Sequence, residues 1–227
     1  MTRPLVIAGS GGLAREAVQA VHAVNAERAT WQLLGFLDDD ATRHGTVIDG
    51  VPVLGPITAD SIPETAQVLL ATGRPSDFSS RYRLARRLSL PAERYATVVH
   101  PSACLAADTV LGAGCLVLAG VVATAAVRLG AHVAVMPRAV FTHDDVVADF
   151  ATICAGATFG GSVQIDTGAY VGAGALVREN LRIGAWALVG MGSVVTVDVP
   201  AGEIWYGTPA RRAGFTTPLG VELVRTG

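Results

Sequence analysis

Large aliphatic side chains recur at every sixth position from Leu105 to Val195. Fifteen of the sixteen positions hold Leu, Ile, Val or Phe, and Ala123 is the exception. Helices repeat about every 3.6 residues and strands about every 2, so neither explains this period. A six-residue period is typical of a hexapeptide β-helix, in which each hexad forms one face of a coil and its aliphatic side chain points inward. Three hexads make a coil of about 18 residues, so residues about 18 apart should stack roughly 4.8 Å from each other.

Two further features of the repeat concern its corners and its surroundings. The position after the inward aliphatic residue is often glycine, as tight corners require; these glycines are Gly112, Gly130, Gly160, Gly172, Gly184 and Gly190. Val121, Val127 and Val133 lie in consecutive hexads, and we expect them to face outward. An apolar strip of this kind is poorly hidden in a monomer, so we predict an oligomer.

The first 95 or so residues follow a different pattern, in which strands alternate with helices. PLVIAG, WQLLGFLDDD and AQVLLATG read as strands, while LAREAVQAVHAV and SSRYRLARRLSL read as amphipathic helices. Such alternation predicts a parallel sheet with helices on its faces. We therefore expect an α/β domain over 1–97, an all-β domain over 98–214 and a C-terminal tail over 215–227.

Composition and charge exclude several classes of function. The formal net charge of −2 provides no basic footprint for nucleic acid and no polybasic membrane anchor. No apolar run approaches the roughly 20 residues that span a bilayer, and the N-terminus does not read as a signal peptide. Three cysteines without a CxxC pair are expected to be small buried residues. A cytoplasmic protein without nucleic-acid or membrane partners is predicted.

Six short motifs make nearly the whole chain resemble a known family. In order they are GSGGLARE (9–16), GFLDDD (35–40), ATGR (71–74), VVHPSA (98–103), THDDVVADF (142–150) and GTPARR (207–212). Together with a Gly-rich α/β unit ahead of a hexapeptide β-helix, they resemble the sugar O- and N-acetyltransferases of the NeuD/PglD type. The resemblance implies a Rossmann-like N-terminal domain, a left-handed β-helix, acetyl-CoA as acyl donor without a metal, and a homotrimer.

The stretch Thr142-His143-Asp144 carries the candidate catalytic chemistry. Acyl transfer from a thioester needs a base for the nucleophile and a donor for the developing oxyanion. A histidine with an adjacent carboxylate suits the base, because the carboxylate fixes the tautomer and raises the basicity. Gly161 lies 18 residues after His143, so its N–H is expected one coil above the base. The resemblance assigns these roles to His143, Asp144 and Gly161; a solvated corner and a simple turn glycine are the alternatives.

The resemblance also implies where the acyl donor binds. Backbone groups at Ala173 and Met191 match the family's CoA groove between subunits, and Arg211 and Arg212 match positions that meet CoA phosphates. Thr152 stands nine residues after the base, where the family often has a histidine that contacts acetyl-CoA. Met136-Pro137 also replaces the Asn-Thr pair that usually precedes the base.

The N-terminal glycine loop suggests a nucleotide site. Gly9, Gly11 and Ala14 satisfy G-x-G-x-x-G/A after a strand, which permits a dinucleotide interpretation, although the domain is too short for both halves of an NAD site. By resemblance, the contacts to a nucleotide-linked sugar are Gly12, Leu13, Ala14, Asp38, Asp39 and Gly73. Leu13 replaces a histidine that is common in the family.

The leading hypothesis is a CoA-dependent acyltransferase that acts on an amino or hydroxyl group of a nucleotide-linked sugar, with acetyl as the expected acyl group. One alternative is a non-catalytic scaffold that binds the sugar nucleotide, and another is a different acyl donor or acceptor. A zinc hydratase on the same fold needs three convergent imidazoles. His132 and His143 lie in different phases of the repeat, which argues against it.

Overall fold

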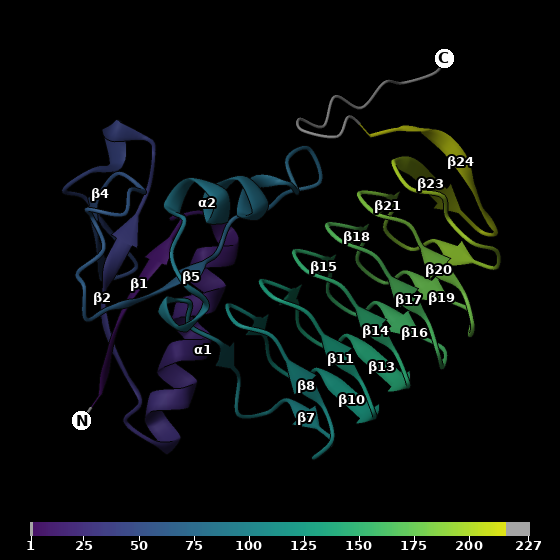
Figure 1. The fold of residues 1–227 in the computed structure, drawn as a ribbon, viewed down its shortest axis with the longest axis horizontal. Helices are drawn as coiled ribbons and strands as arrows, with labels where there is room; N and C mark the ends of the chain where they lie inside the picture. Colours follow the sequence, from purple (N-terminus) through teal and green to yellow (C-terminus); the bar gives the residue numbers. More distant parts are fainter. Residues whose placement is uncertain (1, 217–227) are drawn as a thin grey trace.

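A computed structural model describes residues 2–216 of the chain, and Figure 1 shows its two parts, an α/β unit followed by a long β-solenoid. The predicted tail over 215–227 lies almost wholly outside the described residues. No helix within residues 2–216 is long and apolar enough to cross a membrane.

The N-terminal unit is built on a five-stranded sheet with the order β3-β4-β2-β1-β5. Its strands are β1 (Arg3–Ala8), β2 (Trp31–Leu37), β3 (Val47–Ile48), β4 (Val51–Gly55) and β5 (Gln67–Leu70). All neighbours pair in parallel except β3 and β4, which form an antiparallel hairpin. The three strands predicted from the sequence are therefore confirmed, and β3–β4 is an addition.

Helices cover both faces of this sheet. Helix α1 (Gly12–Glu27) packs its apolar side between β1 and the first solenoid coils, where Ala17 and Val21 share a core with Leu116. Helix α2 (Ser80–Leu88) covers the other face through Leu84 and Leu88. Two 3-10 turns, η1 (Ala41–Arg43) and η2 (Ala92–Arg94), complete the unit. The α/β unit and the solenoid thus share buried side chains.

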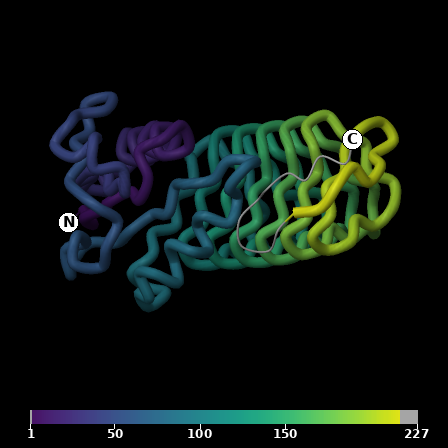
Figure 2. The backbone as a smooth tube through the Cα atoms, turned by 90° about the horizontal axis from the view of Figure 1, so that it is seen from above, coloured from purple at the N-terminus to yellow at the C-terminus, as the bar shows by residue number. Residues whose placement is uncertain are grey.

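The solenoid consists of coils that stack along the long axis of the molecule. Figure 2 shows this stack from above, with the long axis horizontal. Three sheets form its faces, and all their strands pair in parallel except β23 and β24, which form an antiparallel hairpin. The eight-stranded sheet contains β6 (Val98–Val99), β9 (Leu116–Val117), β12 (Ala134–Val135), β15 (Thr152–Ile153), β18 (Tyr170–Val171), β21 (Leu188–Val189), β23 (Glu203–Gly207) and β24 (Ala210–Phe215). The six-stranded sheet contains β7 (Cys104–Leu105), β10 (Val122–Ala125), β13 (Val140–His143), β16 (Thr158–Phe159), β19 (Leu176–Val177) and β22 (Val194–Val195). The five-stranded sheet contains β8 (Val110–Leu111), β11 (Arg128–Leu129), β14 (Val146–Val147), β17 (Gln164–Ile165) and β20 (Arg182–Ile183).

The predicted stacking by 18 residues is confirmed by the pairing of the strands. Val122 pairs with Val140, and Val140 pairs with Thr158. The same step recurs on the other two faces, for example between Thr152 and Tyr170. A residue's neighbours above and below can therefore be read directly from the sequence.

Each hexad sends two side chains into the core. The first is the large aliphatic or aromatic residue at every sixth position, such as the fully buried Phe141. The second lies two positions earlier and is usually Ala or Val, because the narrow triangular cross-section leaves room only for a small partner. Val121, Val127 and Val133 occupy this second position and are fully buried. The expectation that they face outward is therefore wrong.

The glycines after the large inward residues also have a different role from the one expected. A Cβ on Gly112 would lie 2.5 Å from the backbone nitrogen of Ala131, and one on Gly160 would lie 2.6 Å from that of Glu179. These glycines allow the next coil to approach closely. Left-handed φ values occur two residues later, at Gly114, His132, Ser162, Gly174, Trp186 and Gly192.

Candidate active site

His143 and Asp144 form a hydrogen-bonded pair at the end of β13. Nδ1 of His143 lies 2.9 Å from Oδ2 of Asp144, and both side chains are well exposed, at 64% and 62%. Asp144 has a left-handed φ of 62°, which Asp tolerates better than most residues and which turns its carboxylate back toward the ring. An ionised Asp144 can only accept, so Nδ1 carries the proton and Nε2 keeps the lone pair. The pair has the form of a base with its orienting acid.

Gly161 lies directly against the imidazole of His143. A Cβ at this glycine would fall 2.3 Å from both Nε2 and Cε1 of the ring, so only glycine fits beside the ring in this position. The backbone N–H of Ser162 donates to the carbonyl of His143 at 2.8 Å and fixes the register. The N–H of Gly161 has no hydrogen-bond partner among residues 2–216. The structure thus brings together the three residues predicted as catalytic.

Asp145, the second acid of the motif, points into the solenoid core. It occupies a small inward position and is fully buried. Its carboxylate accepts hydrogen bonds from the N–H of Thr142 at 3.0 Å and of Val163 at 2.8 Å. Burial raises the pKa of Asp145 to about 6 despite these two donors. The two aspartates therefore differ: Asp144 orients the imidazole, and Asp145 secures the turn that carries it.

The predicted donor-binding residues form a column at a different corner of the solenoid. Backbone bonds stack Ala155, Ala173 and Met191, since Gly174 donates to Ala155 at 2.9 Å and Gly192 donates to Ala173 at 2.8 Å. No backbone partner binds the N–H of Ala173 or of Met191 in the described part of the chain. Met191 is 78% exposed. This column offers backbone donors and an apolar side chain to an extended ligand.

Arg211 and Arg212 lie on β24, in the hairpin that caps the solenoid. Arg211 pairs with Tyr206, and Tyr206 packs where a Cβ on Gly190 would lie, so the hairpin continues the column above Met191. Arg212 Nη1 lies 3.5 Å from Oε1 of Glu203, whereas Arg211 donates only to a backbone carbonyl. Both arginines are exposed at the end of the predicted donor groove.

Thr152 is not part of this groove. It is buried on the eight-stranded sheet, and its Oγ1 accepts a 2.8 Å hydrogen bond from Nη2 of Arg81. The side chain faces the α/β unit, which covers this face of the solenoid. Thr152 therefore has a partner within the chain and offers its hydroxyl to no ligand in this arrangement.

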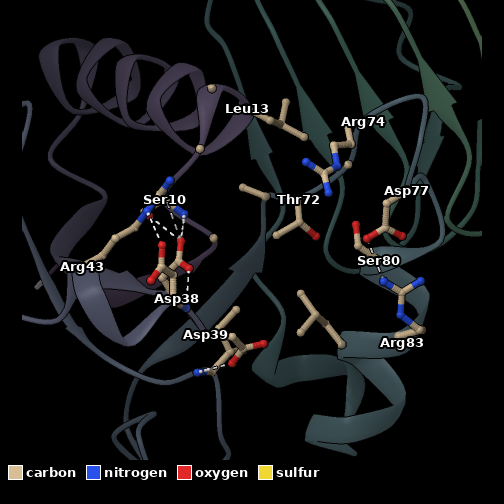
Figure 3. A pocket seen from close by; sticks show the side chains of 18 of the residues that line it. Ser10, Leu13, Asp38, Asp39, Arg43, Thr72, Arg74, Asp77, Ser80 and Arg83 are labelled. Carbon is tan, nitrogen blue, oxygen red and sulfur yellow. Dashed lines mark hydrogen bonds and ion pairs between the residues drawn. The ribbon is translucent and has the colours of Figure 1, made fainter. Parts of the chain in front are cut away.

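A second group of predicted residues lines a cavity of about 910 Å³ at the carboxyl ends of β1, β2 and β5, shown in Figure 3. Gly12, Leu13, Asp38, Asp39 and Gly73 all line it, whereas Ala14 is buried in the core beneath and does not. The cavity also includes residues that were not predicted, of which the polar ones are Ser10, Asp40, Arg43, Thr72, Arg74, Asp77, Ser80, Arg83 and Arg87. Arg83 and Arg87 are four apart on the basic helix α2, a spacing that could have identified them.

The two predicted acids of the cavity are already bound by protein groups. Oδ2 of Asp38 accepts from the N–H and the hydroxyl of Ser10, and its Oδ1 accepts from the N–H of Asp40 at 2.9 Å. Asp39 accepts from Nη2 of Arg87 at 2.8 Å and from the N–H of Ile57 at 3.2 Å. Asp38 therefore holds the glycine loop in place.

Only glycine fits at position 73, because of its backbone conformation and the side chain of Arg81 beside it. The φ of Gly73 is 145°, and a Cβ there would lie 2.7 Å from Nη1 of Arg81.

Among residues 2–216, no group of three or more His, Cys, Asp or Glu side chains could hold a metal ion. Cys115 and Cys154 are buried as expected, but Cys104 is exposed on the six-stranded sheet.

No protein-family model and no curated protein sequence matches the chain. Several solved structures do. The acetyltransferase domain of PglB from Neisseria gonorrhoeae, in complex with acetyl coenzyme A, is 25% identical with a TM-score of 0.82, over 93% of this chain and 100% of that one. WeeI from Acinetobacter baumannii is 27% identical with a TM-score of 0.79, over 93% and 100% of the two chains.

A third similar structure contains CoA together with a nucleotide sugar. It is perosamine N-acetyltransferase from Caulobacter crescentus, with a histidine replaced by asparagine, in complex with CoA and GDP-perosamine. It is 27% identical with a TM-score of 0.81, over 93% of this chain and 97% of that one. The resemblance indicated by the sequence motifs is therefore confirmed: the chain has the β-solenoid of the left-handed β-helix type found in sugar N-acetyltransferases, which are its structural neighbours.

Proposed function

We propose that the protein transfers an acetyl group from acetyl-CoA to an amino group, or alternatively a hydroxyl group, of a nucleotide-linked sugar. The observation that carries this proposal is the pair of His143 and Asp144, with the imidazole lying against Gly161. A base, its orienting acid and an unpaired backbone N–H on the adjacent coil provide the groups that direct acyl transfer needs.

The mechanism follows from the hydrogen-bonding state of these groups. Nε2 of His143 accepts the proton of the sugar amine as its nitrogen attacks the thioester carbonyl. The N–H of Gly161 donates to the oxygen that becomes negatively charged. When the carbon–sulfur bond breaks, the imidazolium returns its proton to the departing thiolate, so that CoA leaves as the thiol. Asp144 stabilises the imidazolium in between, and no covalent enzyme intermediate is needed.

The α/β unit is proposed to bind the acceptor. We assign residues 1–97 to a Rossmann-like acceptor domain and 98–214 to the acyltransferase domain, with 215–227 as the tail. The parallel sheet, the glycine loop before α1 and the cavity at the carboxyl ends of the strands support this division, because α/β sheets bind nucleotides there. The perosamine enzyme, which binds GDP-perosamine, supports a nucleotide sugar as the ligand. A cytoplasmic location stays a prediction.

A homotrimer is proposed because the base and the donor column lie at different corners of the solenoid within one chain. Pro137 belongs to the column of Ala155 and Ala173, as the N–H of Gly156 donates to its carbonyl at 3.0 Å. His143 follows six residues later, at the far end of β13, which is up to roughly 20 Å away along an extended strand. A single corner therefore cannot present both the base and the donor groove.

The outer surface of the six-stranded sheet supports the same conclusion. Its outward positions hold Cys104, Val122, Val140, Thr158, Leu176 and Val194. Leu176 is 48% exposed. The five-stranded sheet also exposes Val110 and Val146, but its other outward positions hold Arg128, Gln164 and Arg182. The α/β unit covers the eight-stranded sheet. Copies that pack through the apolar face would set His143 of one chain beside the donor column of another.

Release of free thiol from acetyl-CoA tests the proposal, with GDP-, UDP- and dTDP-linked amino sugars as acceptors. Wild type should release thiol with at least one of them, and His143→Ala should reduce the rate by about 10²-fold or more. His22→Ala, which changes an exposed histidine of α1, serves as the matched control and should keep the wild-type rate.

Two results would contradict the proposal in different ways. Thiol release that is unchanged in His143→Ala would give the histidine a structural role only. Binding of a nucleotide sugar by wild type without any thiol release would favour the scaffold hypothesis, or an acyl donor other than acetyl-CoA.

A further inference from the structure

Most of the charges in the acceptor cavity are already paired. Arg43 lies 3.3 Å from Asp40 and 3.6 Å from Asp38, and its Nη1 donates to Oγ of Ser10 at 2.8 Å. On the opposite wall, Arg83 binds Asp77 at 2.8 Å and Arg87 binds Asp39 at 2.8 Å. Three of the four arginines that line the cavity are thus held by acids of the same cavity.

Arg74 is the fourth, and its guanidinium has no ion pair or hydrogen bond to any residue of the described part of the chain, although its carbonyl accepts from the N–H of Asp77 at 2.8 Å. It follows Gly73 directly after β5, and Figure 3 shows its guanidinium directed toward Leu13 and Thr72. Oγ1 of Thr72 and Oγ of Ser80, from the same wall, are buried without a partner among residues 2–216. This wall therefore carries an unpaired guanidinium and two hydroxyl groups without hydrogen-bond partners among the described residues.

The side of the cavity toward which Arg74 points is also electropositive. Helix α1 starts at Gly12, no side chain caps it, and its first turn holds no acid. The first N–H groups of a helix have no intrahelical partner and carry about half a positive charge. The helix start at Gly11, Gly12 and Leu13 and the side chain of Arg74 therefore present donors to the same space.

From these contacts we propose that Arg74 binds a phosphate of the acceptor's diphosphate, which lies between its guanidinium and the start of α1. The proposal rests on the proposed function and extends it by naming the residue that recognises a nucleoside diphosphate sugar. Arg74 is suited to this because its planar guanidinium can donate two parallel hydrogen bonds to phosphate oxygens. Asp38, whose oxygens are occupied, acts as a positioning residue for the glycine loop.

The test measures nucleotide binding without catalysis. GDP, UDP and dTDP, and the monophosphate of each, are titrated into wild type, Arg74→Ala and Arg74→Lys by calorimetry. For the diphosphate that binds wild type, Arg74→Ala should weaken binding by about 10- to 100-fold, as expected for loss of a charge-assisted hydrogen bond. The monophosphate should be affected less, and Arg74→Lys should fall between the two because it keeps the charge. Arg28→Ala, an exposed arginine at the other end of α1, is the control and should bind as wild type does.

Steady-state kinetics distinguish the acceptor from CoA, which also carries phosphates. Arg74→Ala should raise the KM for the nucleotide sugar while kcat and the KM for acetyl-CoA stay within about twofold of wild type, the pattern for lost uniform binding. A raised KM for acetyl-CoA alone would overturn the proposal. Unchanged diphosphate affinity in Arg74→Ala would overturn it and leave the proposed function intact. If wild type bound none of the three diphosphates, the acceptor class itself would fall as well.

Discussion

Nη2 of Arg81 donates a 2.8 Å hydrogen bond to Oγ1 of Thr152, which joins α2 to β15 on the covered face of the solenoid. The same guanidinium donates to the carbonyls of Thr72 at 2.7 Å, Phe150 at 2.9 Å and His132 at 3.2 Å. Arg81 is only 1% exposed and no carboxylate among residues 2–216 forms an ion pair with it, so burial lowers its pKa to about 10. It links the floor of the acceptor cavity to two coils.

Replacement of Arg81 by Met should therefore lower the free energy of unfolding by at least about 2 kcal/mol, because several buried carbonyls lose their donor. Urea unfolding would measure the change. Thr152→Val removes only one of the acceptors and should cost about 1 kcal/mol or less. Equal stability of Arg81→Met and wild type would show that water replaces the guanidinium at no cost.

Gly161→Ala should reduce activity without much loss of stability. The added Cβ would meet the side chain of His143, which can rotate away at the surface, and the base would then leave its position. We expect thiol release to fall about 10-fold or more. Gly112→Ala is the contrasting variant, because its Cβ would meet backbone 2.5 Å away and should lower the Tm instead. Full activity in Gly161→Ala would show that the ring need not lie against this residue.

His132 should make a contribution to stability that is lost in acid. Burial first, and then the charge of Arg81, lower the pKa of His132 to about 4. The unfolded chain binds this proton near pH 6.5, so stability from His132 is full above about 6.5 and is lost as the pH falls toward 4. The loss amounts to about 3 kcal/mol. His132→Asn, which suits the left-handed φ of 57° at this position, should remove this contribution, and urea unfolding of the variant and of wild type between pH 4 and 7 would measure the difference.

Asp145 should act in the opposite direction over nearly the same range. Its folded pKa of about 6 lies above the usual value near 3.8, so its contribution is full below about 3.8 and is lost as the pH rises through 6. The two groups should nearly cancel in wild type, and stability should change little between pH 4 and 6. In His132→Asn the Asp145 effect would be exposed, and stability should then increase on acidification by about 3 kcal/mol. A variant that is also flat would contradict the raised pKa of Asp145.

Leu176→Asp should disrupt the proposed oligomer. Leu176 lies on the apolar face of the six-stranded sheet, and a charge buried there between copies would have no partner. Sedimentation analysis should show a smaller species, and thiol release should fall with it because the base and the donor column then belong to separated chains. Gln164→Asp on the five-stranded sheet should leave both properties unchanged. An active Leu176→Asp monomer would place the complete site within one chain.

Much of the solenoid could be predicted because the hexad period is a property of the sequence alone. The step of 18 residues located Gly161 above His143 without any structure. The direction of Val121, Val127 and Val133 was mispredicted, because the period reveals one inward position clearly while the second holds residues as apolar as an exposed strip would. Asp145 shares that second position, so its burial follows only once the geometry is known.

The acceptor cavity was less predictable, because its walls come from distant segments. Three arginines of the cavity come from separate segments: the turn after β2 holds Arg43, the loop after β5 holds Arg74, and helix α2 holds Arg87. Only the fold decides which of these side chains forms an ion pair with an acid. Arg81 carries no motif at all. Its position in a basic helix predicts exposure, and tertiary packing against the coil that contains Thr152 overrides that expectation.

The constant step between coils means that the repeat region keeps all of its strand pairings when its length changes by whole turns. A single residue inserted within β14 would put its inward and outward positions out of step with the strands above and below, unless the extra residue loops out at a corner. Insertion of one complete turn, taken for example from 162–179, would preserve every inward side chain and extend the prism by about 4.8 Å. Whole-turn insertion above Gly161 thus offers a way to alter the length of the donor groove while the base, its acid and the glycine beside them keep their places.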